Sequence, residues 1–212
     1  VPTGNFGDVF AGYIAKRMGL HIDQLVVATN QNDILHRCLS TGKYQKNMVL
    51  PSLSPSMDIQ VSSNFERALF DAYDRDGSAV SRAMEALSHK GGFSLSQGVS
   101  ERLGQYFSSN SASEEETLAT IKNCFAKTGE LLCPHSAIGV NVAEKSRVAE
   151  TPMITLATAH PAKFPDVVEK ASDLRPALPE RMADLYERSE RLIRVENDLI
   201  KLEEIVKERI KA

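Results

Sequence analysis

The chain has 212 residues, of which 42% are hydrophobic and 25% are charged, and its 25 Lys and Arg nearly balance its 28 Asp and Glu. A net charge of −3 creates no field that would gather phosphate backbones, which argues against nucleic acid as the main partner. Because no apolar run approaches the roughly 20 residues needed to cross a bilayer, the composition predicts a cytoplasmic protein without a membrane partner.

The first 45 residues alternate between helix and strand patterns. A helix is predicted by apolar residues at helical spacing, namely Val9, Phe10, Tyr13, Ile14 and Met18. Residues 25–28 form the short, continuously apolar run of a strand that is covered on both faces. A second helix is expected from residue 34, with Asn32 or Asp33 as its cap and Gly42 at its end. This alternation predicts an α/β fold with a largely parallel sheet flanked by helices.

The middle of the chain is predicted to be mainly helical. Residues 51–58 are rich in Ser and Pro and indicate an irregular loop. Three helices are then expected: one over residues 65–73, one over residues 80–87, and one that begins at a Ser113–Glu116 capping box and ends near Lys127. Residues 65–128 are therefore predicted to be a mainly helical insertion within a single region that spans residues 1–212.

Strand and helix patterns return in the last third of the chain. Pro134 can begin a helix, because its missing N–H is not needed in a first helical turn. Residues 153–158 are apolar and rich in β-branched side chains, which predicts a strand, and a helix containing Phe164 is expected to follow. Residues 179–212 are predicted to form two C-terminal helices with an extended break, the second capped by Asn197; one helix of about 30 residues is the alternative.

The heptapeptide Pro-Thr-Gly-Asn-Phe-Gly-Asp at residues 2–8 has the clearest chemical pattern. Gly4 and Gly7 let backbone N–H groups turn inward without interference from Cβ, and a predicted helix N-terminus follows at once. This arrangement can bind an anion such as a phosphate group, to which Thr3 and Asn5 can donate further hydrogen bonds. The spacing differs from those of the ATP-binding P-loop and the dinucleotide-binding loop. By chemistry alone, an ordinary turn between strand and helix remains the favoured interpretation.

Other reactive side chains show no arrangement typical of a site. The cysteines, Cys38, Cys124 and Cys133, do not have the spacing of metal ligands and are predicted to be free thiols. The histidines do not have that spacing either, so no metal site is expected: His21, His36, His89, His135 and His160. His135 is expected only to help begin a helix, and His160 with Lys163 to be a helix-start histidine and a solvated lysine. Asp58 and Asn64 are expected to form a turn and cap a helix, with contact to a substrate as the alternative.

Five stretches of the sequence carry a family resemblance. They are VPTGNFGD with the helix after it (residues 1–16), ATN with NDIL (28–35), SPSMDI with SNFER (54–67), PHSAIG (134–139) and TLATAHPAKF (155–164). In this order they resemble the threonine synthases, which are pyridoxal-phosphate enzymes of fold type II. The resemblance implies a partial type II fold. It also implies conversion of O-phosphohomoserine and water to threonine and phosphate by a carbon–oxygen lyase, the final step of threonine biosynthesis.

The resemblance also implies which residues bind the cofactor. The phosphate of pyridoxal phosphate would be held by the first loop, that is by Thr3, Gly4, Asn5, Phe6 and Gly7. Thr158 would place its hydroxyl beside the pyridine nitrogen. Because a hydroxyl supplies no negative charge that would raise the pKa of that nitrogen, the nitrogen would stay largely unprotonated.

One departure from the family pattern concerns the Schiff-base lysine, which in this family lies upstream of the phosphate loop. No lysine precedes Val1, so the resemblance implies that these residues are the C-terminal part of a catalytic region truncated at its N-terminus. The missing N-terminal half would then be a partner, and the 212 residues alone would have no turnover. Two alternatives stay open: a serine or threonine dehydratase-like lyase of the same fold, and a non-catalytic module that binds phosphate or a protein.

Overall fold

The computed structural model describes residues 1–210 and divides the chain into two units, residues 1–177 and the remainder from residue 178. No helix within residues 1–210 combines the length and the apolar character needed to cross a membrane.

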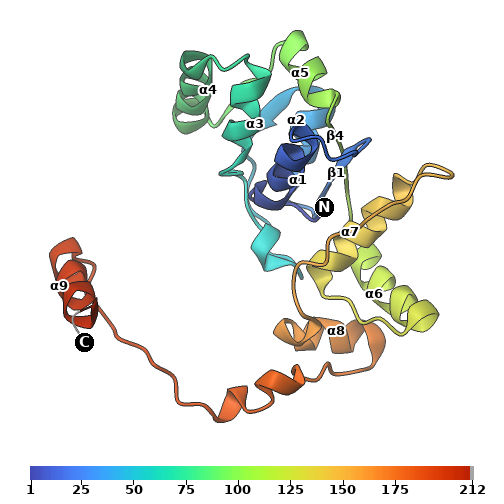
Figure 1. Ribbon diagram of the computed structural model, residues 1–212, viewed down its shortest axis with the longest axis vertical. Coiled ribbons are helices and arrows are strands. Elements are labelled where there is room, and N and C mark those ends of the chain that lie inside the picture. The colour runs from blue at the N-terminus through green and yellow to red at the C-terminus, as the bar shows by residue number, and fades with distance from the viewer. Residues whose placement is uncertain (211–212) are drawn as a thin grey trace. The chain divides into compact units, whose positions relative to one another are not determined.

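The first unit is organised around a pair of parallel strands. β1 (Leu25–Thr29) pairs with β4 (Phe107–Ser111), and Pro2 adds one parallel bridge to Ala28. Three helices contact β1 (Figure 1), namely α1 (Gly7–Arg17), α2 (Ile34–Thr41) and α7 (Pro134–Lys145). The expected α/β class, with helices flanking a parallel sheet, is confirmed.

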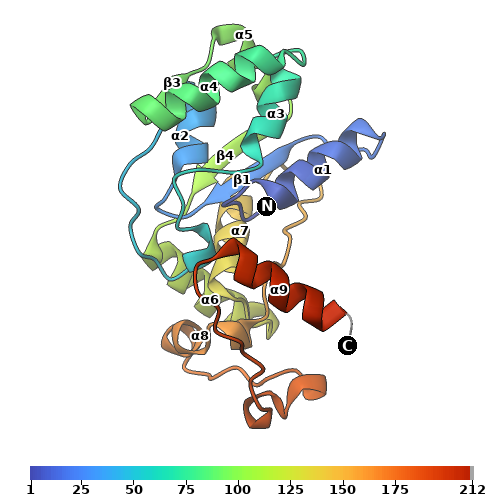
Figure 2. The same ribbon diagram turned by 90° about the vertical axis from the view of Figure 1, so that its left-hand side faces the viewer.

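A group of helices surrounds a second, smaller sheet at the top of Figures 1 and 2. This sheet pairs β2 (Lys43–Gln45) with β3 (Gly92–Ser94) in antiparallel fashion. The helices are α3 (Phe65–Ala72), α4 (Gly77–Lys90) and α5 (Gln97–Gly104). The helices predicted over residues 65–73 and 80–87 are therefore confirmed. Neither β3 nor β4 was predicted. In the case of β4, the sequence FSSNS is polar, and the segment becomes a strand only by pairing with β1.

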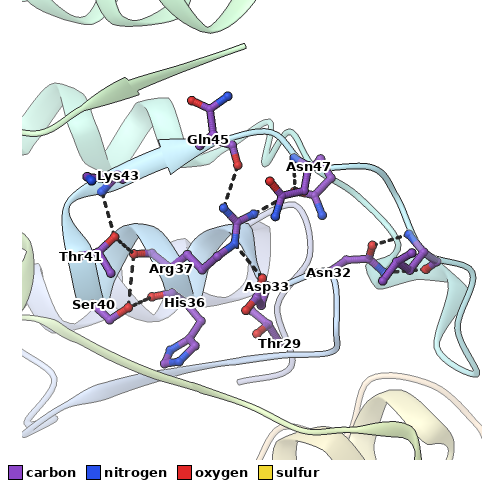
Figure 3. Close-up of polar contacts among 12 residues, drawn as sticks. Thr29, Asn32, Asp33, His36, Arg37, Ser40, Thr41, Lys43, Gln45 and Asn47 are labelled. Carbon is purple, nitrogen blue, oxygen red and sulfur yellow. Dashed lines mark hydrogen bonds and ion pairs between the residues drawn. The ribbon is translucent and has the colours of Figure 1, made fainter.

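The start of α2 is tied to β2 through Arg37 (Figure 3). Its guanidinium donates hydrogen bonds to the Asp33 carboxylate at 2.8 Å and to the Gln45 carbonyl oxygen at 2.9 Å. The predicted end of this helix is also found, since Gly42 follows α2 with a φ of 72°, which a residue with a side chain rarely adopts. These contacts hold the second sheet against the element that follows β1.

Three helices pack together below the main sheet in Figures 1 and 2: α6 (Glu114–Thr128), α7 and α8 (Pro165–Ser172). α6 begins with the predicted capping box. Ser113 Oγ accepts a hydrogen bond from the Glu116 N–H at 3.2 Å, and the Glu116 carboxylate accepts one from the Ser113 N–H at 2.9 Å. Lys145 lies 2.6 Å from the Glu116 carboxylate and joins α7 to α6, which lowers the pKa of Glu116.

The strand predicted over residues 153–158 is wrong. The segment is extended, but within the described part of the chain it pairs with no strand, and Ile154 is 79% exposed. The Thr155 methyl group packs against α7 instead, since a Cβ added at Gly139 would lie 2.9 Å from Thr155 Cγ2. An apolar, β-branched run indicates a tendency to pair, whereas a strand requires a partner with free backbone groups.

The second unit differs from the expected pair of helices. Two short 3₁₀ turns, Glu180–Met182 and Leu185–Glu187, replace the first helix. α9 (Leu199–Ile210) is the second, and the last two residues of the predicted helix lie outside the described range. Its cap is Asp198 and not Asn197, because Asp198 Oδ1 accepts the Ile200 N–H at 2.8 Å.

Candidate functional site

A cavity of about 140 Å³ lies where the loop before α1 meets the start of α7. Its lining residues come from the start, the middle and the last third of the first unit: Pro2, Thr3, Gly4, Asn5, Phe6, Gly7, Asp8, Ser56, Met57, His135 and Thr158. All six residues that the sequence singled out for cofactor binding are among them, although Thr158 is more than 150 residues from the loop. The fold therefore brings these residues to one place.

The loop is anchored by Phe6, whose side chain points into the core. The Phe6 ring makes edge-on contacts with Phe65 and Phe107, each at 5.2 Å between ring centroids. Its φ of 69° is unusual for a residue with a Cβ, and the buried ring stabilises this left-handed backbone. The contribution of Phe6 to the cavity is thus its backbone, while its ring fixes where the loop lies.

Gly4 is required because a second loop approaches it closely. A Cβ added at Gly4 would lie 3.0 Å from the carbonyl oxygen of Ser56 and 3.2 Å from Cα of Met57. Ser62 Oγ donates a hydrogen bond to the Gly4 carbonyl oxygen at 2.8 Å. The backbone contact explains why glycine occupies this position.

The loop presents backbone donors that have no acceptor within the described part of the chain. Within residues 1–210, no group accepts a hydrogen bond from the N–H of Gly4, Asn5 or Phe6. The N–H of Gly7 is used locally, since it donates to Asn5 Oδ1 at 2.8 Å. Thr3 differs from the expectation, because its hydroxyl donates to the Val1 carbonyl oxygen at 2.6 Å instead of facing an anion with its proton. Free N–H groups next to a helix N-terminus form an anion-binding arrangement.

Asn64 holds this loop from the next element, a role that the sequence did not reveal. Its backbone N–H donates to the Asn5 carbonyl oxygen at 2.9 Å, and its side-chain amide donates to the same oxygen at 3.1 Å. Asn64 is at the N-cap position of α3, as expected, but its side chain makes no capping hydrogen bond. The start of α3 therefore supports the loop beside the cavity.

Asp58 organises a buried polar cluster that fixes the other loop to the end of β1. Its Oδ1 accepts hydrogen bonds from the side-chain amides of Asn30 at 2.8 Å and Asn32 at 2.9 Å, and its Oδ2 accepts the Ser52 N–H at 2.8 Å. Figure 3 shows Asn32 reaching the same loop, where its amide also donates to the Leu50 carbonyl oxygen at 2.8 Å. With its acceptor sites used in this way, Asp58 is a turn-forming residue, as expected.

His135 has a place in the cavity that its neighbours in the sequence did not indicate. It lines the cavity, only 5% of it is exposed, and neither ring nitrogen has a hydrogen-bond partner within the described part of the chain. Its ring packs on Phe164 at 4.6 Å between centroids. Burial lowers the pKa of His135, and the positive charge of Lys163 lowers it further, while Asp58 opposes the shift. The imidazole is therefore neutral near pH 7. The one feature of the sequence that pointed to His135 is its position in PHSAIG, a stretch that carries the family resemblance.

Thr158 reaches the cavity from the extended segment, although that segment is not a strand. Its N–H donates a hydrogen bond to Ser136 Oγ at 3.1 Å. After it, His160 Nδ1 accepts the Ala162 N–H at 3.2 Å and so begins the 3₁₀ turn Pro161–Lys163, while Lys163 itself is exposed. This geometry agrees with the prediction of a helix-start histidine at His160 and a solvated lysine at Lys163.

No group of three His, Cys, Asp or Glu residues comes together as a possible metal site among residues 1–210. The three cysteines are free thiols, as expected, and Cys38 and Cys133 are buried. Burial raises the pKa of the Cys38 thiol to about 12, so it stays protonated and unreactive at neutral pH. The candidate site thus rests on backbone N–H groups, a hydroxyl and a neutral imidazole.

Comparison with known proteins places this geometry in a family. Residues 136–206 match the family model described as the C-terminal domain of threonine synthase. The threonine synthase of Pseudomonas aeruginosa is 51% identical over 208 residues, which is 97% of this chain and 44% of that protein. The crystal structure of pyridoxal-phosphate-bound threonine synthase from Brucella melitensis is 50% identical, with a TM-score of 0.93 over 100% of this chain and 46% of that one.

The yeast threonine synthase structure gives the same result at lower identity. It is 36% identical, with a TM-score of 0.87, and the match covers 99% of this chain and 46% of that one. The chain therefore spans a little under half the length of these relatives. Its strands, helices and cavity loops follow their fold, which confirms the expected type II pyridoxal-phosphate architecture. By sequence and by fold, the chain resembles the threonine synthases along its whole length.

Proposed function

We propose that the protein is a threonine synthase, a cytoplasmic pyridoxal-phosphate-dependent carbon–oxygen lyase. It converts O-phosphohomoserine and water to threonine and inorganic phosphate. One observation carries the proposal: the loop from Thr3 to Gly7 and the distant Thr158 line one cavity. The chain in which they do so is 51% identical to a threonine synthase over almost its whole length.

The residues present fit the cofactor at its phosphate end. The free N–H groups of Gly4, Asn5 and Phe6 supply hydrogen-bond donors at the start of α1, where the helix adds partial positive charge. A side chain at Gly4 would fill the space between the two loops. His135 lines the same cavity, and neither of its buried ring nitrogens has a hydrogen-bond partner among residues 1–210. These features together suit a phosphorylated ligand better than an apolar one.

When bound, pyridoxal phosphate supplies an electron sink that delocalises a carbanion on the substrate. The N–H groups of Gly4, Asn5 and Phe6 would hold its phosphate, and the Thr158 hydroxyl would lie beside its ring nitrogen. Ser136 would keep Thr158 in position through its hydrogen bond to the Thr158 N–H. Since no carboxylate occupies the position of Thr158, nothing there raises the pKa of the ring nitrogen.

The remaining catalytic groups are proposed to lie outside these residues. The relatives are more than twice as long as the matched region, which leaves room for the Schiff-base lysine in the part of the enzyme that this chain does not span. The 212 residues would then form the C-terminal part of the catalytic α/β region, with residues 65–128 as a mainly helical insertion. The N-terminal half would be their partner.

The test uses the full-length protein with added pyridoxal phosphate. We expect an aldimine absorbance band, and release of phosphate and threonine in equal amounts from O-phosphohomoserine. Release of ammonia and a keto acid would favour the dehydratase-like alternative, and the absence of both the band and turnover would favour a non-catalytic module. The 212 residues alone serve as the comparison, and we expect them to release no phosphate.

A further inference from the structure

The buried imidazole of His135 makes no hydrogen bond within residues 1–210. A buried polar group without a hydrogen-bond partner destabilises a fold, and native proteins leave few of them. Within residues 1–210, both ring nitrogens of His135 are in this state, while only 5% of the residue is exposed. The neighbouring Ser136 differs, because its hydroxyl accepts the Thr158 N–H.

The position of His135 directs it toward a ligand. It is in the first turn of α7, a helix of 12 residues, and it lines the cavity together with the loop from Thr3 to Gly7 and Thr158. Phe164 packs against the ring, so the imidazole is held in place without a polar contact. A ring that lines a cavity, is held by apolar packing and leaves both nitrogens without a hydrogen bond is preorganised to bind a polar group.

We infer that His135 is a further cofactor-contacting residue of this cavity, which hydrogen-bonds bound pyridoxal phosphate through a ring nitrogen. This inference rests on the proposed function and adds a contact that the phosphate loop and Thr158 do not supply. A neutral imidazole offers one donor and one acceptor, so it can satisfy a polar cofactor atom without placing a second charge in the cavity. Two charged side chains affect it in opposite directions, since Lys163 favours the neutral form and Asp58 the protonated form.

Two substitutions separate hydrogen bonding from packing in the full-length protein. His135→Phe keeps a planar ring against Phe164 but removes both nitrogens, whereas His135→Asn keeps a donor and an acceptor. We expect the dissociation constant of pyridoxal phosphate, followed by aldimine absorbance, to rise about 10- to 100-fold in His135→Phe and to recover in part in His135→Asn.

The apoprotein of His135→Phe is expected to melt at or above the wild-type temperature, because the buried unpaired nitrogens are gone. The matched control is His21→Asn, at a histidine side chain that is 99% exposed, and it should bind as the wild type does.

Nuclear magnetic resonance of wild-type protein labelled with ¹⁵N-histidine provides the second measurement, and it decides the question if the variants fail to fold. We expect the ring-nitrogen signals of His135 to shift when pyridoxal phosphate is added. An aldimine band with unshifted His135 signals, or wild-type affinity in His135→Phe, would overturn this inference while leaving the proposed function intact. A wild-type protein that forms no band at all would overturn both.

Discussion

The Thr158 N–H donates a hydrogen bond to Ser136 Oγ at 3.1 Å, which joins an extended segment to the first turn of α7. Ser136 is buried, whereas Thr158 is exposed at the cavity. The segment from residue 153 to 158 pairs with no strand in the described part of the chain, so this hydrogen bond replaces strand pairing in holding the segment in place. It holds Thr158 beside the loop that begins at Thr3.

We expect Ser136→Ala to lower the free energy of unfolding by about 0.5–1.5 kcal/mol, because the Thr158 N–H loses its acceptor. Affinity for pyridoxal phosphate should fall with it, since Thr158 is less well held. Urea unfolding and aldimine absorbance measure the two effects. Ser40→Ala is the control, because the exposed Ser40 donates its Oγ hydrogen bonds only to carbonyl oxygens of its own helix. Equal affinity in the two variants would contradict the positioning role of Ser136.

We expect Gly4→Ala to weaken binding of pyridoxal phosphate by at least tenfold. The added Cβ would lie 3.0 Å from the Ser56 carbonyl oxygen, so one of the two loops must move, at a cost of about 1–3 kcal/mol in stability. Gly104→Ala is the matched control, because nothing lies within 4 Å of a Cβ there and alanine is the better helix former. That variant should gain about 0.5–1 kcal/mol in stability with unchanged binding. Unchanged binding in Gly4→Ala would show that the loop tolerates displacement.

We expect Asp58→Asn to lower the free energy of unfolding by about 1.5–3 kcal/mol. The carboxylate accepts from Asn30, Asn32 and the Ser52 N–H, and an amide at this site would turn its NH₂ group toward another donor. Asp166→Asn removes a carboxylate from an exposed ion pair with Arg175, and it should cost less than about 1 kcal/mol. Denaturant unfolding of both variants measures the difference, and equal losses would contradict the importance of the buried cluster.

The pH dependence of stability should report the burial of His135. Burial lowers its pKa in the folded state from the ordinary value of 6.5, so the unfolded chain binds more protons as the pH falls below that value. The stability that comes from keeping the imidazole neutral is present above pH 6.5 and is lost on acidification. Wild type should therefore lose more unfolding free energy than His135→Phe between about pH 7.5 and about pH 5.5. Parallel losses in urea unfolding at the two pH values would contradict a lowered pKa.

Local patterns in the sequence predicted the elements that depend on neighbours along the chain. The apolar run of β1, the glycine that ends α2 and the capping box of α6 are all found where the pattern indicates them. Each depends on residues within a few positions of one another, so the amino-acid order contains the needed information. For the same reason, the glycine pattern at residues 2–8 could be recognised as a candidate phosphate-binding loop.

The features that make these elements a site depend on contacts between distant residues. β4 is a strand because β1 pairs with it, and residues 153–158 are not a strand because no partner reaches them within the described range. His135 could be assigned only a helix-starting role from its neighbours, and its unpartnered state depends on packing against Phe164 and the cavity wall. By itself the sequence determined most of the helices of the first unit, the first strand and the position of the glycine-containing loop at residues 2–8. Only the tertiary structure decided that Thr158 and His135 meet that loop, because burial and pairing arise from contacts that sequence distance does not specify.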